Sequence, residues 1–239
     1  LKDFKRLVEI AKCKNVLIEK PITDNVKDAM EIKSIAEKHG VKVFVAYDMR
    51  FIKVFDLIRE CVSRYRGDIR IVKIYVGQYL PEWRPYKDYR LSYSSHRNMG
   101  GGVDLDLSHE IDYMLWLFGY PEKSLFTLAK KISNLEIDSP DYFKGIYEYP
   151  RFIADVEMDY IRSKDRKLII LGENINILEA DFIRKTLKIM GEDSNNTDLF
   201  DYEKIYIDEI KEFLDINPKT YLCTINEAID VMKLLNIET

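Results

Sequence analysis

The sequence predicts a mixed α/β protein in which a partial parallel sheet is followed by a large, mainly antiparallel sheet. Two patterns lead to this prediction. Residues 3–65 alternate between helical and strand patterns with short links, which is typical of a doubly wound parallel sheet. Residues 123–190 contain strand patterns without crossover helices, which indicates an antiparallel sheet with helices on one face. We therefore expect an α/β part over residues 1–66 and an α+β part over residues 67–239.

The first part is expected to contain a helix, a strand, a helix, a strand and a helix, over residues 3–15, 16–20, 23–40, 41–51 and 52–65. Its helices show apolar residues at i, i+3 and i+4 spacing, whereas its strands are short apolar runs. Pro21 ends the first strand because it cannot donate to a sheet ladder. Thr23 or Asp24 is expected to cap the second helix at its N-terminus, and Gly40 to end it.

The second part opens with a long alternating strand over residues 68–80, and an irregular stretch rich in Trp, Tyr, Arg and Gly follows over 81–103. A helix is expected after these glycines, up to Phe118. The remaining elements are six strands over residues 123–133, 143–150, 152–161, 166–174, 175–182 and 185–190, and two closing helices over 200–214 and 224–236.

The composition excludes several classes of protein. The formal net charge is −4 and no dense Lys/Arg block occurs, so the chain has no electrostatic reason to bind nucleic acid or anionic lipid. No apolar run is long enough to span a bilayer, and the first residues do not form a signal peptide. Cys13, Cys61 and Cys223 are far apart, which favours neither a disulfide framework nor a structural zinc site. We expect a cytoplasmic protein with no nucleic-acid partner and no membrane partner.

Glu19, Lys20 and Pro21 follow directly on the first strand, in the segment VLIEKP. Functional groups of open α/β sheets collect at the carboxyl ends of the strands. Pro21 also restricts Lys20 to extended geometry, so the lysine is held where the chain leaves the sheet. This position favours a functional lysine, and the alternative is a solvated lysine at a strand end.

The segment GGGVDLDLSHEIDYMLWLFG, residues 100–119, places Asp106 and His109 three residues apart and therefore on one face of a helix. The helix dipole lowers the pKa of a histidine at a helix N-terminus, and a carboxylate one turn away raises it again. A group that titrates near neutral pH suits proton transfer. The alternative is a capped helix with a hydrogen-bonded histidine.

Two other interpretations of this segment are disfavoured. His109 could share a metal ion with Asp106 or Glu110, but a zinc site needs at least three protein ligands. His96 is the only plausible second imidazole, so no metal is expected. A dinucleotide-binding loop needs GxGxxG between a strand and a helix, whereas these glycines are contiguous and follow an irregular segment.

Taken together, VLIEKPIT, YDMRF, EWRPYKDYRLSYS and the glycine-led segment resemble the glucose-fructose oxidoreductase / inositol dehydrogenase (Gfo/Idh/MocA) family of NAD(P)-dependent sugar oxidoreductases. The resemblance extends from the first residues to the closing helix. It implies the C-terminal half of a Rossmann domain over residues 1–66, then an α+β domain over 67–239 with a large, mainly antiparallel, open-faced sheet. Such sheets commonly pack against a second subunit, so the resemblance implies a homodimer or homotetramer.

The resemblance also implies roles for individual residues. Lys20 would lie near the nicotinamide and the reacting hydroxyl, His109 would be the main acid/base, and Asp106 would orient His109 or bind a sugar hydroxyl. Many relatives have the aspartate four residues before the histidine, where this chain has Leu105. The other implied contacts are with the cofactor, from Glu19, Pro21, Arg50, Trp83 and Arg84, and with the substrate, from Tyr93 and Asp48.

The chemistry suits these residue types. A hydride leaves a carbinol carbon only if the hydroxyl proton leaves too. A lysine ammonium stabilises the developing alkoxide, a histidine accepts the proton, and NAD or NADP carries the redox step. The expected substrate is a sugar, a nucleotide sugar or a polyol, and the glycines are expected to let the backbone pass close to the nicotinamide and the substrate.

The chain begins with Leu1 rather than methionine, and GxGxxG does not occur in it. We therefore expect a fragment or a truncated gene product that lacks the pyrophosphate loop, leaves a sheet edge unpaired and is inactive alone. The alternative function is a non-catalytic oligomerisation or binding module built on the open sheet. A metal-dependent sugar isomerase or lyase is disfavoured because the chain lacks metal ligands.

Overall fold

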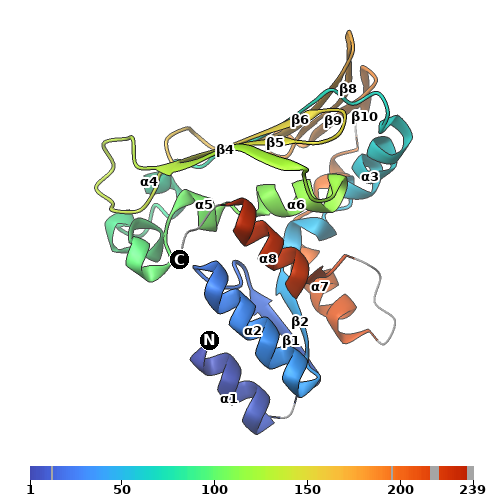
Figure 1. Cartoon of the computed structure of the whole chain (residues 1–239). Coiled ribbons are helices and arrows are strands. Elements are labelled where there is room, and N and C mark those ends of the chain that lie inside the picture. Colours follow the sequence, from blue (N-terminus) through green and yellow to red (C-terminus); the bar gives the residue numbers. More distant parts are fainter. Residues whose placement is uncertain (12, 195, 216–220, 236–239) are drawn as a thin grey trace.

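The computed structural model describes residues 1–11, 13–194, 196–215 and 221–235. A small sheet and a large sheet lie one above the other in the view of Figure 1, with helices packed between them. The chain starts in the small sheet, forms the large one and returns to the small sheet near its C-terminus. This architecture confirms the expected Rossmann-like start and the large, mainly antiparallel sheet that follows it.

The small sheet consists of two parallel strands and one short antiparallel strand. β1 (Asn15–Glu19) pairs in parallel with β2 (Lys42–Ala46), and β11 (Cys223–Thr224) pairs antiparallel with the other edge of β2. The helices around it are α1 (Lys2–Ala11), α2 (Val26–His39) and α8 (Ile225–Leu234). Within the described ranges β1 is paired on one side only, so the predicted unpaired sheet edge is present.

The N-terminus of α2 differs from the prediction. The side chain of Asn25 accepts a hydrogen bond from the backbone N–H of Asp28 at 2.7 Å, so Asn25 is the N-cap rather than Thr23 or Asp24. Thr23 instead donates its hydroxyl to the carbonyl oxygen of Asn25 at 2.6 Å. Gly40 ends the helix as predicted, with a φ of 65° that favours glycine.

The second strand is shorter than the predicted range 41–51. β2 ends at Ala46, and a 3₁₀ turn, η1 (Asp48–Phe51), precedes α3 (Val54–Tyr65). The four successive side chains from Tyr47 to Arg50 are all buried. A strand points alternate residues to opposite faces, so four successive buried side chains at this point favour a turn.

The large sheet has eight strands in the part of the chain that is described, in the order β10-β9-β8-β7-β3-β6-β5-β4. β3 and β6 pair in parallel, and the other neighbours are antiparallel. The strands are β3 (Ile71–Gly77), β4 (Lys123–Lys130), β5 (Tyr142–Glu148), β6 (Ile153–Asp159), β7 (Asp165–Gly172), β8 (Ile175–Asp181), β9 (Thr186–Ile189) and β10 (Glu192–Ser194).

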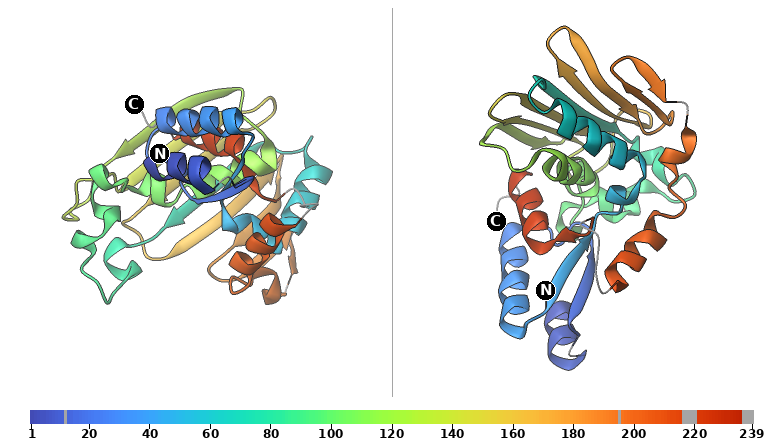
Figure 2. Two further views of the ribbon diagram at one scale, coloured as in Figure 1. Left: turned by 90° about the horizontal axis from the view of Figure 1, so that it is seen from below. Right: turned by 90° about the vertical axis from the view of Figure 1, so that its right-hand side faces the viewer.

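One face of the large sheet is packed and the other is open. Along β3, Val72, Ile74 and Val76 are buried, whereas Lys73 on the opposite face is exposed. α3 and α6 (His109–Phe118) lie on the packed face, between the large sheet and the small one (Figure 2, right). The outer face carries no helix among the described residues (Figure 1).

The segments around the glycines contain more helix than expected, but in shorter pieces. The stretch expected to be irregular holds α4 (Leu80–Trp83) and three 3₁₀ turns, η2 (Tyr89–Leu91), η3 (Tyr93–Ser95) and η4 (Arg97–Met99). The single helix expected up to Phe118 is broken at Leu107 and Ser108 into α5 (Val103–Asp106) and α6.

The closing region also differs in detail. The helix predicted over 200–214 is replaced by η5 (Thr197–Phe200) and α7 (Ile205–Leu214). α8 matches the second closing helix up to residue 234, and residue 236 of that prediction lies outside the described residues. None of the helices in the described ranges combines the length and the apolar character that crossing a membrane requires.

Candidate active site

Lys20 lies where β1 ends, at the position that the sequence predicted. Glu19 is the last residue of the strand and is exposed, and Pro21 follows through a cis peptide bond. The Lys20 ammonium donates a hydrogen bond to the backbone carbonyl oxygen of Asp106, which joins the small sheet to the segment before α6. Burial lowers the pKa of Lys20, and the charge of Asp106 partly offsets this effect.

His109 is the first residue of α6, and its side chain is 12% exposed. Its Nε2 lies 3.7 Å from Asp48 Oδ1, while its buried Nδ1 has no hydrogen-bond partner among the described residues. Burial, followed by the positive charges of Lys20 and Arg166, lowers the pKa of His109 well below its usual value. The imidazole is therefore neutral at neutral pH and able to accept a proton. The expectation that it titrates near neutrality is corrected, because two cations and burial outweigh the neighbouring carboxylate.

Asp106 points elsewhere, although only two residues separate it from His109 in the chain. Its Oδ2 accepts a hydrogen bond from the Tyr160 hydroxyl at 2.5 Å, and after burial the charge of Asp106 raises the pKa of the nearby Tyr93. The break between α5 and α6 removes the helical register that would place the two side chains on one face. The expectation of a shared face is therefore wrong, and Asp48, which was expected to contact substrate, is the carboxylate beside the imidazole.

Two further charged residues belong to this cluster, and sequence reasoning did not assign them to it. Glu110 of α6 is fully buried, and Arg166 Nε of β7 lies 2.9 Å from Glu110 Oε1. The two charges are close, yet the geometry leaves both Glu110 oxygens and Arg166 Nε without a hydrogen bond. Burial raises the pKa of Glu110, and the charge of Arg166 counteracts it.

Arg50 was expected to contact the cofactor, but its guanidinium is bound to carboxylates of the protein. Its side chain is 1% exposed, and its guanidinium donates to both carboxylate oxygens of Asp112, at 2.6 and 2.9 Å. A third hydrogen bond, of 3.0 Å, goes to Glu227 of α8. These bonds join η1, α6 and α8, and they leave no exposed guanidinium for a cofactor.

The glycines before α5 serve the loop in which they lie. Gly100 and Gly102 have φ values of 77° and 132°, which side chains rarely adopt. A Cβ on Gly101 would lie 2.1 Å from the carbonyl oxygen of Tyr93 and 2.7 Å from that of His96. These glycines therefore let residues 93–102 fold tightly against their own backbone, and the expected close approach to the nicotinamide and the substrate stays a prediction.

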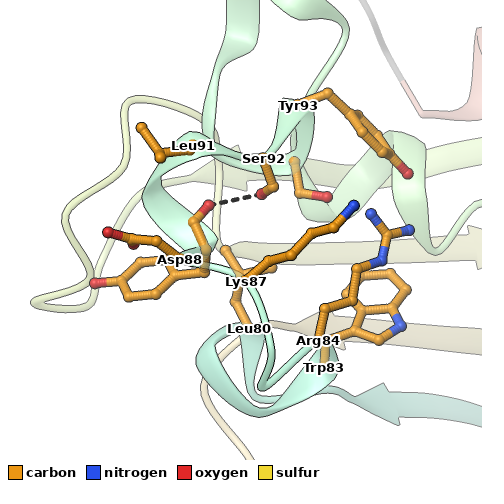
Figure 3. A pocket seen from close by; sticks show the side chains of 10 residues that line it. Leu80, Trp83, Arg84, Lys87, Asp88, Leu91, Ser92 and Tyr93 are labelled. Atoms are coloured by element: carbon orange, nitrogen blue, oxygen red, sulfur yellow. Dashed lines mark hydrogen bonds between the residues drawn. The ribbon is translucent and has the colours of Figure 1, made fainter.

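Trp83, Arg84 and Tyr93 line a cavity of about 400 Å³ beside this cluster (Figure 3). The Trp83 ring packs against Tyr160 with centroids 6.1 Å apart, and Tyr160 in turn binds Asp106. Trp83 also lines a second cavity, of about 360 Å³, whose wall includes Arg166. The loop residues expected to contact cofactor and substrate therefore lie next to the cluster of Lys20 and Asp106.

A metal centre finds no support in the described ranges, where no group of three or more His, Cys, Asp or Glu could hold a metal ion. His96, the other imidazole considered, hydrogen-bonds through Nε2 to the carbonyl oxygen of Arg90 at 2.8 Å. Instead, the described residues around His109 keep its imidazole neutral, and the ammonium of Lys20 is close by. A neutral base near an ammonium suits proton transfer at a hydroxyl.

Two family comparisons together cover most of the chain. Residues 57–177 match the family described as the GFO/IDH/MocA C-terminal domain. Residues 5–47 match the oxidoreductase family with an NAD-binding Rossmann fold. The chain belongs to the GFO/IDH/MocA family.

Curated GFO/IDH/MocA relatives are similar over part of their length. The chain is 30% identical over 130 residues to an uncharacterized oxidoreductase of Synechocystis sp., and the match covers 54% of this chain and 33% of that protein. It is 28% identical over 141 residues to the scyllo-inositol 2-dehydrogenase (NADP(+)) of Bacillus subtilis, with 59% and 38% covered. The chain therefore spans about a third of the length of the curated relatives it matches.

Solved structures share the fold over nearly the whole chain. The WlbA dehydrogenase from Bordetella pertussis, solved with NADH and UDP-GlcNAcA, superposes with a TM-score of 0.76 at 17% identity, covering 99% of this chain and 71% of that one. The UDP-N-acetylglucosamine 3-dehydrogenase from Acidithiobacillus ferrooxidans gives a TM-score of 0.73 at 18% identity, covering 98% and 72%. At these identities the likeness establishes the fold.

Proposed function

We propose that this chain carries the catalytic residues of an NAD(P)-dependent oxidoreductase that moves a hydride to or from a hydroxyl-bearing carbon of a sugar, nucleotide sugar or polyol. The observation that carries the proposal is the position of Lys20 beside His109. The lysine comes from the end of β1 and the histidine from the start of α6, and the lysine charge contributes to the low pKa of the histidine. The inositol dehydrogenase relative and the sugar-nucleotide dehydrogenases of the same fold support it.

His109 is suited to receive the hydroxyl proton. In the resting site the ring is neutral, because a second proton would add a charge to a buried ring that faces two cations. Buried Nδ1 has no hydrogen-bond partner in the part of the chain that the structure describes, so Nε2, which lies 3.7 Å from Asp48, is the nitrogen at which the added proton is best stabilised. General acid–base catalysis of this kind contributes about 10²–10⁴-fold to a rate.

Lys20 and Asp106 orient the reacting hydroxyl in this proposal. The ammonium already holds the carbonyl oxygen of Asp106, and its remaining N–H groups are free to stabilise an alkoxide. The carboxylate of Asp106 accepts a hydrogen bond from Tyr160, which packs against Trp83 in the wall of the cavity of Figure 3. We therefore assign Asp106 to substrate positioning and Asp48 to the support of His109.

The proposed cofactor, NAD or NADP, supplies the hydride acceptor or donor when bound. Glu19 and Pro21 flank the Lys20 ammonium at the carboxyl end of β1, where nicotinamide rings of open α/β sheets lie, so this end of the chain fits the group. The 239 residues contain no GxGxxG. We therefore expect them to bind dinucleotides weakly and to be inactive alone.

A chimera tests this function. A GxGxxG-containing N-terminal Rossmann segment, joined ahead of residue 1, is expected to give NAD(P)-dependent turnover on one of a panel of polyols and UDP-sugars. Lys20→Ala and His109→Ala should each lower kcat by about 10²-fold or more while dinucleotide binding stays unchanged. His39→Ala, on an exposed histidine, is the control.

Two results would oppose the proposal: a chimera that binds the dinucleotide but reduces or oxidises nothing in the panel, or full activity without His109. Light scattering on the same chimera is expected to give the mass of a dimer or tetramer, because the open face of the large sheet is the surface proposed for subunit contact. Turnover by the 239 residues alone would contradict the expected inactivity.

A further inference from the structure

The cavity beside Tyr93 has aromatic walls and two cations. It measures about 400 Å³, and Trp83 and Tyr89 are among the side chains that line it. The guanidinium of Arg84 lies 5.9 Å from the ring centroids of both Trp83 and Tyr93. Figure 3 shows this guanidinium and the amine of Lys87 directed to the same side of the cavity, next to Tyr93.

The positive charge in this cavity is not neutralised by the protein. Neither Arg84 nor Lys87 forms an ion pair with any residue in the described ranges. Asp88 also lines the cavity, but its carboxylate is 2.7 Å from the Arg90 guanidinium, which in turn reaches Glu136. Two cations that converge without a counter-ion raise the local potential, so the cavity attracts an anion.

We propose that this cavity binds the phosphate-bearing part of the substrate, and that the substrate is therefore a sugar joined to a nucleoside diphosphate rather than a free sugar or polyol. The inference rests on the proposed function, since it names the substrate class of the same site. Arg84 and Lys87 provide charge-assisted hydrogen bonds to phosphate oxygens, and the rings of Trp83, Tyr89 and Tyr93 provide faces for a base. The proposal thus assigns Trp83 and Arg84 to the substrate, whereas the family resemblance implies contacts with the cofactor.

The position of the cavity fits a substrate whose sugar lies at Lys20 and His109 and whose phosphate-bearing part lies in the cavity. Tyr93 lines the cavity together with Trp83, and Trp83 packs on Tyr160, which donates a hydrogen bond to the Asp106 carboxylate; the carbonyl oxygen of Asp106 holds Lys20. A sugar that reaches Lys20 and His109 therefore extends past Tyr93 into the cavity. Binding energy gained there, away from the reacting carbon, holds the sugar in place for the chemistry at Lys20.

A dinucleotide cofactor also carries a diphosphate, so the test separates the two sources. UDP, uridine, inorganic pyrophosphate, NAD and NADP are titrated separately into the 239-residue chain, by calorimetry and by tryptophan fluorescence. The double variant Arg84→Ala/Lys87→Ala is compared with Arg64→Ala/Lys38→Ala, which removes the same charge from exposed positions outside the cavity. Circular dichroism and thermal melts confirm that both variants are folded.

UDP is expected to bind the parent chain at least about tenfold more tightly than uridine, and the cavity variant to weaken UDP by about tenfold or more while the control does not. No UDP binding, equal binding of uridine and UDP, or equal weakening by both variants would overturn the proposal. If the cavity variant lost NAD or NADP binding while its UDP binding were unaffected, the cavity would belong to the cofactor, and the proposal would be overturned as well. Each of these results is obtained without turnover, so a failure here leaves the proposed hydride transfer standing.

Discussion

Helix α6 carries two buried carboxylates, two residues apart, and each faces an arginine in a different way. Asp112 accepts two hydrogen bonds from Arg50, at 2.6 and 2.9 Å, and Arg50 is also bound by Glu227. Glu110 lies 2.9 Å from Arg166 Nε, but neither group is hydrogen-bonded within the pair. One pair is complete in the free protein, whereas the other retains unused donors and acceptors.

The difference indicates how one helix serves two purposes. The complete pair connects α6 to η1 and α8, away from the two cavities that flank the reacting groups. In the incomplete pair, Glu110 directly follows His109 in α6, and Arg166 lowers the pKa of the imidazole and lines the second cavity. Buried groups that the protein itself leaves unsatisfied cost stability, and they concentrate where a ligand completes them.

The largest effect is expected from breaking the complete pair. Arg50→Met should reduce the free energy of unfolding by about 3–5 kcal/mol, because it leaves Asp112 buried without a partner. Urea denaturation measures this loss. The double variant Arg50→Met/Asp112→Leu is the control, and it should recover much of the stability since it removes both charges. A loss below about 1 kcal/mol in the single variant would show that the pair is not structural.

A smaller loss is expected at the incomplete pair. Arg166→Met should reduce the free energy of unfolding by about 1–3 kcal/mol, because fewer hydrogen bonds are lost than at Arg50. It should also raise the pKa of His109, because one of the cations that lowers it disappears. NMR titration of the imidazole follows this change, with Arg64→Met as the control. The comparison breaks down if Arg166→Met is as destabilising as Arg50→Met, or if the titration of His109 does not move.

The smallest effect concerns another carboxylate that is incompletely paired, Glu209. Glu209 of α7 is buried with Oε1 unpaired among the described residues, and burial, together with Asp48 and Glu19, raises its pKa to about 8. Between pH 4.5 and 8 the folded protein keeps this proton and the unfolded chain does not, so stability decreases as pH rises through that window. Glu209→Gln should therefore raise the Tm by about 2–4 °C at pH 8, equivalent to about 1 kcal/mol, and change it little at pH 4.5. Melting curves at the two pH values, with the exposed Glu60→Gln as control, test this, and an equal gain at both would disprove it.

Much of the fold followed from local patterns in the sequence. The apolar strand that ends at Glu19, the C-cap at Gly40 and the strands after residue 123 all depend on neighbours within a few positions. The errors arose where tertiary contacts override such patterns. The strand predicted over 41–51 ends early because Arg50 turns inward to Asp112, a residue on a helix that forms much later in the chain.

The candidate site was predictable only where local sequence patterns indicate it. Lys20 and His109 were found because each lies at an element terminus with a recognisable motif. A charged residue within the apolar helix α6 was a usable signal for Glu110, but nothing near Tyr160 or Arg166 in the sequence connects them to Asp106 or Glu110. Spacing also suggested that Asp106 faces His109, and the break between α5 and α6 is not visible in the sequence pattern.

The short strand β11 has a consequence for how the protein acquires its structure. Cys223 and Thr224 pair with Val45 and Phe44, so about three-quarters of the 239 residues separate the two partners. During synthesis the edge of β2 stays uncovered until β11 has been made, and α8 reaches α2 only after that. Contacts of such long range slow folding, so β1 and β2, which carry Lys20 and precede the large sheet in the chain, gain their third strand only after the large sheet has been synthesised.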